Sequence, residues 1–141
     1  GNVLIDTISN EDSDPKVLCL VLEQLKASLC NPKKFSSIIN YTKSSTTLKW
    51  KSIKFVAKAL HRTGISKTGL VAFLAVDSGT TALNQAVMRG DVEIVNILLE
   101  SGADPYVEND LGMNAFDICE KFGPFQSVRN ALWEHVRELY L

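Results

Sequence analysis

The sequence lacks the features that mark membrane-spanning and secreted proteins. Its longest uninterrupted apolar run covers only residues 70–76, whereas a membrane-spanning helix needs about 20 residues. The cysteines number only three and include no C-x-x-C pair. Cys19 and Cys119 have apolar neighbours, so we expect both to be reduced core residues, as in intracellular proteins. We therefore expect an intracellular, cytoplasmic protein.

The sequence also lacks the motifs of nucleophilic, phosphate-binding and metal chemistry. No G-x-S-x-G occurs, and the segment 64–69 reads G-I-S-K-T-G, in which the lysine precedes the second glycine instead of following it as in a P-loop. The two histidines, His61 and His135, have no cysteine or second histidine three or four residues further on, as a metal site would need. We therefore predict no catalytic residues, no metal ligands and no cofactor.

Charge of either sign is not in excess over the whole chain. The sequence has 15 basic and 16 acidic residues and a formal net charge of −1, so no overall field attracts nucleic acid or an anionic membrane. One segment, 33–62, is rich in lysine and contains no acidic residue. This segment is either a binding patch for an acidic partner, phosphorylated sequence, anionic lipid or RNA, or a solvated helix face whose lysine stems cover apolar surface. We favour the second interpretation.

What the sequence does contain is an internal repeat. When it is shifted against itself by 33 residues, Gly79 falls on Gly112, Gly90 falls on Gly123, and Ala82 falls on Ala115. Glycine therefore returns at turn positions and apolar residues return at core positions. A period of this length is typical of proteins built from stacked helical units.

One unit, residues 79–104, predicts two helices and their ends. Gly90 separates the helices, because a left-handed residue is easily accepted only as glycine, and the side chain of Asp91 is placed to cap the second helix. Gly102 and Pro105 end the second helix. The apolar residues recur with helical spacing in both helices, at Leu83, Ala86 and Val87 and then at Ile94, Val95, Leu98 and Leu99.

This unit resembles the ankyrin repeat. The family's T-P-L-H-x-A stands here as T-A-L-N-Q-A at 81–86, and its G-x-x-E-x-V-x-x-L-L-x-x-G-A-D is complete at 90–104. Two residues depart from the pattern, since Ala82 replaces proline and Asn84 replaces histidine. The resemblance implies an all-α solenoid of stacked helix-turn-helix units with short loop or hairpin fingers. It also implies a non-catalytic module that binds a partner protein or peptide.

The rest of the chain matches this pattern less closely. We expect a single domain with a clear repeat at 77–109, a C-terminal capping repeat at 110–141, and weak repeats with insertions at about 1–40 and 41–76. One insertion is expected around 31–47. The second helices of the units are expected to start near positions 14, 52, 91 and 124. Four repeats are expected, with three as the alternative.

The resemblance also implies which residues contact a partner, because loop tips and the exposed faces of first helices do so in this family. An alternative is that Tyr106 packs along its own loop and that Phe122, with Ile118, fills the space between units. A second functional hypothesis is a regulatory or targeting domain of a larger multidomain enzyme or channel, since the chain begins at Gly1 and not at methionine. The predicted partner-binding residues are Gln85, Met88, Arg89, Tyr106, Glu108, Asp110, Lys121 and Phe122.

Overall fold

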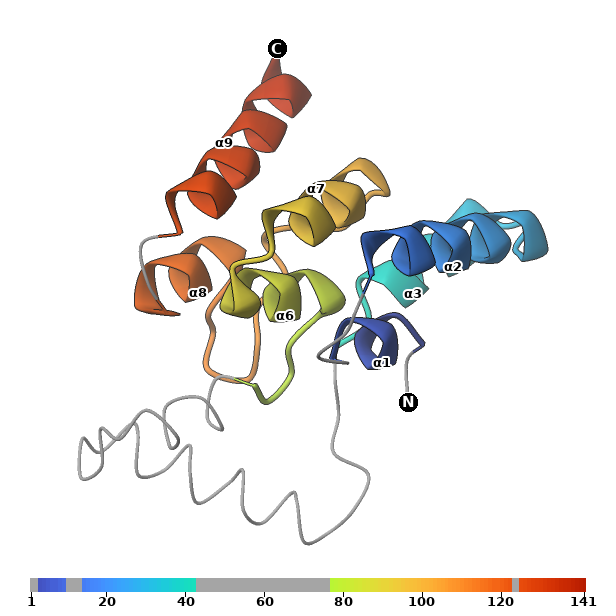
Figure 1. The fold of residues 1–141 in the computed structure, drawn as a ribbon, viewed down its shortest axis with the longest axis horizontal. Helices are drawn as coiled ribbons and strands as arrows, with labels where there is room; N and C mark the ends of the chain where they lie inside the picture. Colours follow the sequence, from blue (N-terminus) through green and yellow to red (C-terminus); the bar gives the residue numbers. More distant parts are fainter. Residues whose placement is uncertain (1–2, 10–13, 43–76, 123–124) are drawn as a thin grey trace, which may run out of the picture.

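The computed structural model describes residues 3–9, 14–42, 77–122 and 125–141. Every regular element within these ranges is a helix, which confirms the all-α prediction for this part of the chain. No helix in these ranges is both long and apolar enough to cross a membrane. The helices are α1 (Val3–Ser9), α2 (Pro15–Ser28), α3 (Pro32–Ile39), α6 (Ala82–Arg89), α7 (Val92–Glu100), α8 (Ala115–Phe122) and α9 (Gln126–Tyr140) (Figure 1).

Short polar side chains set where several helices begin. The Asp14 carboxylate accepts a hydrogen bond from the Lys16 backbone N–H at 2.9 Å, and the Thr81 hydroxyl accepts one from the Asn84 N–H at 3.1 Å. Asp91 caps α7 through the Ile94 N–H at 3.3 Å. Each bond satisfies one of the free N–H groups in a first helical turn. The second helices predicted to start near 14 and 91 are thus confirmed.

The other two predicted starts had different outcomes. The helix expected near position 124 begins at Gln126, after Phe125 as its N-cap residue. The start expected near position 52 lies outside the described residues.

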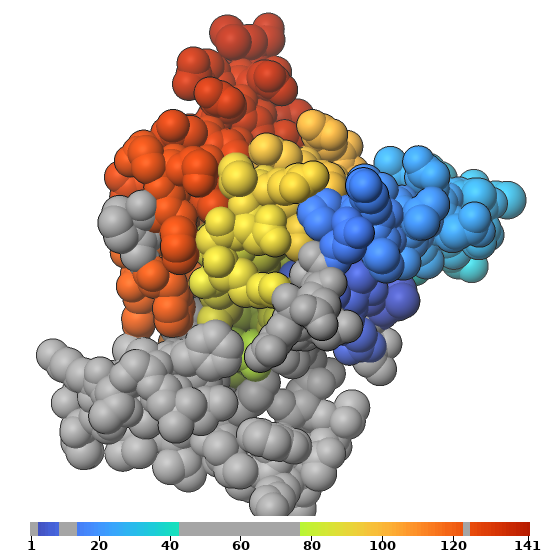
Figure 2. All heavy atoms as spheres, in the orientation of Figure 1, coloured from blue at the N-terminus to red at the C-terminus, as the bar shows by residue number. Residues whose placement is uncertain are grey.

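The helices pack in pairs, and the pairs are neighbours. α1 packs on α2, α6 on α7, and α8 on α9, while α6 also contacts α1 and α8, and α7 also contacts α2 and α9. The first helices of the pairs therefore form one row and the second helices another (Figure 1). Figure 2 shows the pairs side by side, from blue through yellow to red.

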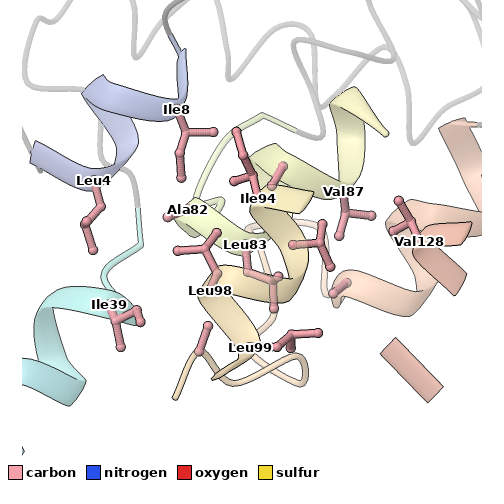
Figure 3. Close-up of a cluster of buried hydrophobic side chains, with 14 of the residues drawn as sticks. Leu4, Ile8, Ile39, Ala82, Leu83, Val87, Ile94, Leu98, Leu99 and Val128 are labelled. Carbon is pink, nitrogen blue, oxygen red and sulfur yellow. The ribbon is translucent and has the colours of Figure 1, made fainter. Parts of the chain in front are cut away.

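Helix α3 is an addition to this pattern. It lies within the stretch 31–47 where an insertion was expected, and Ile39 at its end is buried close to Leu4 of α1 (Figure 3). The side chain of Asn40 accepts a hydrogen bond from the Asp104 N–H at 2.7 Å. This bond links the end of α3 to the loop that follows α7.

The predicted units correspond unevenly to the helices. The units 77–109 and 110–141 contain α6 with α7 and α8 with α9, respectively, and the unit 1–40 contains α1, α2 and the additional α3. The unit expected at 41–76 lies outside the described residues except for 41–42. The number of repeats therefore stays a prediction.

The core runs through all the packed helices without interruption. Leu83 of α6 and Ile94 and Leu98 of α7 are almost completely buried, between Ile8 of α1 on one side and Val128 of α9 on the other (Figure 3). Burial of such apolar side chains is the main favourable contribution to folding.

The two cysteines expected in the core had opposite outcomes. Cys119 is buried in α8, as expected, but Cys19 is exposed. The core face of α2 is formed by Leu18 and Leu22. Cys19 lies one residue beyond Leu18, which turns its side chain about 100° away from the core.

Candidate binding surface

Four of the predicted partner-binding residues lie in the last turns of two neighbouring helices. Met88 and Arg89 end α6, and Lys121 and Phe122 occupy the matching positions of α8, which packs against α6. We refer to these four residues as the helix-end group. Met88 and Phe122 are half-buried against the core, whereas Lys121 is exposed. Partial burial of its ammonium group lowers the pKa of Lys121.

Arg89 also has a structural contact. Its guanidinium donates a hydrogen bond to the backbone carbonyl of Ile8, in the last full turn of α1. The last four carbonyls of a helix have no partner inside the helix, so Arg89 satisfies one of them while the rest of its side chain is accessible. A substitution at Arg89 therefore changes both the surface and the α1–α6 contact.

Gly90 forms the turn that follows Met88 and Arg89 at the end of α6. It has a φ of +73°, the left-handed conformation predicted from the sequence, and the ring of Phe125 lies directly against it. A Cβ atom at this position would come within 2.6 Å of Phe125 Cε1. Glycine is needed here both for the backbone conformation and for the close approach of the α9 N-terminus.

Three further predicted residues, Tyr106, Glu108 and Asp110, lie on the loop between α7 and α8, and we refer to them as the finger group. Asn109 holds this loop in shape. Its side-chain oxygen accepts hydrogen bonds from the N–H groups of Leu111 and Met113 at 3.0 and 2.9 Å, and its own N–H donates to the Met113 carbonyl at 2.9 Å. Sequence reasoning missed Asn109, because no spacing rule distinguishes an organising asparagine from other loop asparagines.

Asp110 connects the finger to the segment before α6. Its carboxylate accepts a hydrogen bond from the Ser78 hydroxyl, and its backbone N–H donates to the Ser78 carbonyl at 3.0 Å. Ser78 and Asp110 are 32 residues apart in the sequence. Asp110 thus ties the base of the finger to the segment that precedes α6. Glu108 is exposed on the finger.

Tyr106 packs on α8 and not along its own loop, so the alternative interpretation of the sequence was wrong, whereas its role as a partner contact stays a prediction. Its ring centroid lies 5.6 Å from that of Phe116, and the Phe116 centroid lies 4.9 Å from that of Trp133 on α9. The three rings form tilted contacts of the kind that aromatic pairs favour. Tyr106 and Trp133 are still 48% and 55% exposed, so one face of this row is available to a partner.

Gln85 is not on the surface, contrary to the prediction. Its side chain is buried, and its Nε2 donates to the Asp77 carboxylate at 2.7 Å and to the Thr80 hydroxyl at 3.3 Å. Ile118, which occupies the matching position of α8, is also buried. This position therefore faces inward in both units, and glutamine is accepted in α6 because polar groups before the helix accept its hydrogen bonds.

The helix-end group and the finger group do not form one patch. Asp110 contacts Ser78, which precedes α6, whereas Met88 and Arg89 lie at the opposite end of that helix. An eight-residue helix is about 12 Å long. The surviving predicted residues therefore form two candidate contact areas, one at each end of the first helices.

Among the described residues, neither a metal site nor the part of the basic segment at 33–42 adds to this surface. In the part of the chain that the structure describes, no three His, Cys, Asp or Glu side chains cluster closely enough to hold a metal ion. Of the basic residues in 33–62, only Lys33 and Lys34 fall within the described ranges, and both are exposed on α3. The predictions for 43–62, and for His61, lie outside the described residues.

Comparison with protein families gives one match, to the ankyrin repeat, over residues 78–110. The matched range contains α6, α7 and the loop as far as Asp110. A search among curated proteins gave no match. The resemblance noted in the sequence is thus confirmed for this repeat, which contributes residues to both candidate contact areas.

Proposed function

We propose that this chain, in which residues 78–110 are an ankyrin repeat, is a non-catalytic module that binds a partner protein or peptide. Ankyrin repeats typically serve protein recognition. The observation that supports the proposal best is the display of diverse accessible side chains on hydrogen-bonded turns. Tyr106 and Glu108 place an aromatic ring and an acid on the finger, and Lys121 adds a base in the last turn of α8. Tyrosine is enriched where interfaces derive most of their affinity.

The proposed contact residues are those of the helix-end group and the finger group. Gln85, which belongs to neither group and is buried, is no longer proposed. Tyr106 is the leading anchor, because its ring is supported by Phe116 on one side and half exposed on the other. A ring that is already held loses little conformational entropy on binding. Met88 and Phe122 offer apolar area beside the charge of Lys121. The partner would therefore bring an apolar side chain and an acidic group to the helix ends.

The proposed setting is the cytoplasm. All three cysteines, Cys19, Cys30 and Cys119, are free thiols, and the first two are exposed. Exposed unpaired thiols are usual in reducing compartments and uncommon in secreted domains.

The proposal is tested by affinity capture from cell lysate with two matched baits. The surface variant carries Tyr106→Ala, Glu108→Lys and Lys121→Glu, which leaves the net charge unchanged. The control carries Lys16→Glu and Glu23→Lys on the exposed side of α2, which also leaves the net charge unchanged. Far-UV circular dichroism and urea unfolding would first establish that both variants are folded.

We expect the unmodified chain and the α2 control to capture the same protein, and the surface variant to lose it. Capture that is equally strong with all three baits would refute the assignment of these residues. Loss of the protein from the α2 control instead would move the contact area to the second helices.

A further inference from the structure

A groove that is lined by Tyr106 lies between α7 and α9, two of the second helices. It has a volume of about 460 Å³ and separates the end of α7 and its following loop from the C-terminal half of α9. Space of this size accommodates a few side chains and not a folded domain. Its lining includes Glu100, Asp104, Tyr106, His135, Leu139 and Tyr140.

On the α9 side of this groove, large apolar side chains are exposed. The first part of α9 buries Val128 and Leu132 against the neighbouring helices, but Leu139 and Tyr140 are 67% and 80% exposed. Figure 1 shows that the C-terminal end of α9 rises away from the other helices. Together with Tyr106, these side chains give the groove an aromatic and aliphatic wall that no described part of the chain covers.

The opposite rim of the groove is acidic. Glu100, at the end of α7, and Asp104, in the following loop, are both exposed. Neither carboxylate forms an ion pair with another residue that the structure describes. The ion pair found among the described residues joins Arg129 to Glu120. Within the described ranges, the Asp104 carboxylate accepts one hydrogen bond, from the Tyr106 backbone N–H at 2.9 Å.

Nearby charges on α9 are mostly of the same sign. Glu134 and Glu138 are exposed one residue before the groove residues His135 and Leu139, and Arg137 is exposed between them in the sequence. The groove therefore combines apolar walls with a net negative rim. Such a rim attracts cations, and the faces of Tyr106 and Tyr140 add favourable sites for an arginine or lysine.

We propose that this groove binds a basic amphipathic segment of a partner protein. An apolar side chain of the segment enters between Tyr106 and Leu139, and a lysine or arginine next to it lies against Glu100 and Asp104. The inference rests on the proposed protein-binding function and adds a third contact area, which shares Tyr106 with the finger group and has a stated partner chemistry. Nucleic acid and anionic lipid are disfavoured, because their phosphates would be repelled by the same carboxylates. A second copy docked groove to groove would bring the acidic rims together.

The test uses the whole chain and a fluorescein-labelled helical peptide with leucines on one face and lysines on the other. Binding is measured by fluorescence anisotropy, beside two peptides in which glutamate replaces lysine or serine replaces leucine. Glu100→Lys is the principal variant. It is not expected to impair folding, because Glu100 is exposed and a cation at a helix C-terminus is favourable. Its matched control is Glu23→Lys on α2, which is also exposed and changes the net charge equally.

We expect the lysine peptide to bind the unmodified chain and both substituted peptides to bind much more weakly. Glu100→Lys should weaken binding by about tenfold, the effect of losing roughly 1.4 kcal/mol, and Glu23→Lys by less than about twofold. Leu139→Ser with Tyr140→Ser should weaken binding by at least about tenfold, since it removes the apolar wall.

Several outcomes would overturn the inference. Equal losses in Glu100→Lys and Glu23→Lys would mean that only the overall charge attracts the peptide. Binding of the glutamate peptide as strong as that of the lysine peptide would mean that the acidic rim does not contribute to binding. A dimer in sedimentation that Leu139→Ser abolishes would assign the groove to a second copy. A chain that captures a partner through the helix-end and finger groups but binds no basic peptide would refute this inference alone and leave the proposed function intact.

Discussion

The turn at Gly90 allows a quantitative prediction from two neighbouring features of the structure. Gly90 has a φ of +73°, and a Cβ atom there would lie 2.6 Å from Phe125 Cε1 and 2.7 Å from Cδ1. Gly90→Ala therefore introduces both a strained backbone and a collision with a half-buried ring at the start of α9. Real Cβ atoms do not approach other heavy atoms this closely, so Phe125 or the turn must move.

The two costs can be estimated separately. Placing alanine in a left-handed conformation costs about 1 kcal/mol, and forcing extra volume into a packed site costs roughly 1–3 kcal/mol. We expect Gly90→Ala to lower the free energy of unfolding by about 2–4 kcal/mol. Gly112 is the matched control, because it has the same φ of +73° and its nearest atom would be Glu108 Oε2 at 3.9 Å. Gly112→Ala should therefore cost only the first term, about 1 kcal/mol.

The assay is urea unfolding followed by far-UV circular dichroism for both variants. A third variant, Gly90→Ala with Phe125→Leu, should recover part of the lost stability, because the smaller side chain leaves room for the Cβ atom. Equal destabilisation of the Gly90 and Gly112 variants would refute the reasoning, since it would mean that α9 does not approach the turn as the structure places it.

Three further predictions concern the core and the cysteines. Leu98→Ala should lower the free energy of unfolding by about 2–5 kcal/mol, since Leu98 is fully buried, whereas the exposed Leu139→Ala should change it by less than about 0.5 kcal/mol; similar values in urea unfolding would contradict the packing described. Burial raises the pKa of the Cys119 thiol, so iodoacetamide should modify Cys19 and Cys30 well before Cys119 in a mass-spectrometric time course, and modification at equal rates would contradict this. Because the folded state favours the neutral Cys119 thiol, its contribution to stability is present below the ordinary pKa of 9.0 and is lost as the pH rises through the raised value. Stability above pH 9.0 should thus fall more steeply in the unmodified chain than in Cys119→Ala, and parallel curves would exclude the effect.

The helices that were predictable are those whose ends have strong local signals. Gly90 and Asp91 stand between two amphipathic stretches, and both took the expected roles, as a left-handed residue and as a helix cap. Such signals act over a few residues and depend little on the rest of the fold. Helix α2, which was placed by the weaker match of its segment to the repeat pattern, also begins at such a cap, Asp14.

The predictions that depended on the packing of distant segments were weaker. The burial of Gln85 depends on Asp77 and Thr80, which accept its hydrogen bonds. The repeat pattern alone does not show that a polar side chain at this position finds hydrogen-bond acceptors inside the protein. The position of Tyr106 depends on Phe116, ten residues further on, and on Trp133 of α9. Cys19 was misplaced because residues 17–22 of its helix are all apolar, so the sequence did not indicate which side of α2 faces the core.

We propose that the chain binds a partner protein through the ends of its first helices and through the finger. The most direct measurement is hydrogen–deuterium exchange of the chain with and without the captured partner, read in peptides that cover 86–90, 104–110 and 119–122. We expect the partner to slow exchange in these three segments and to leave α2 and α3 unchanged. Slowed exchange confined to α2 and α3, with the three segments unaffected, would contradict the claim.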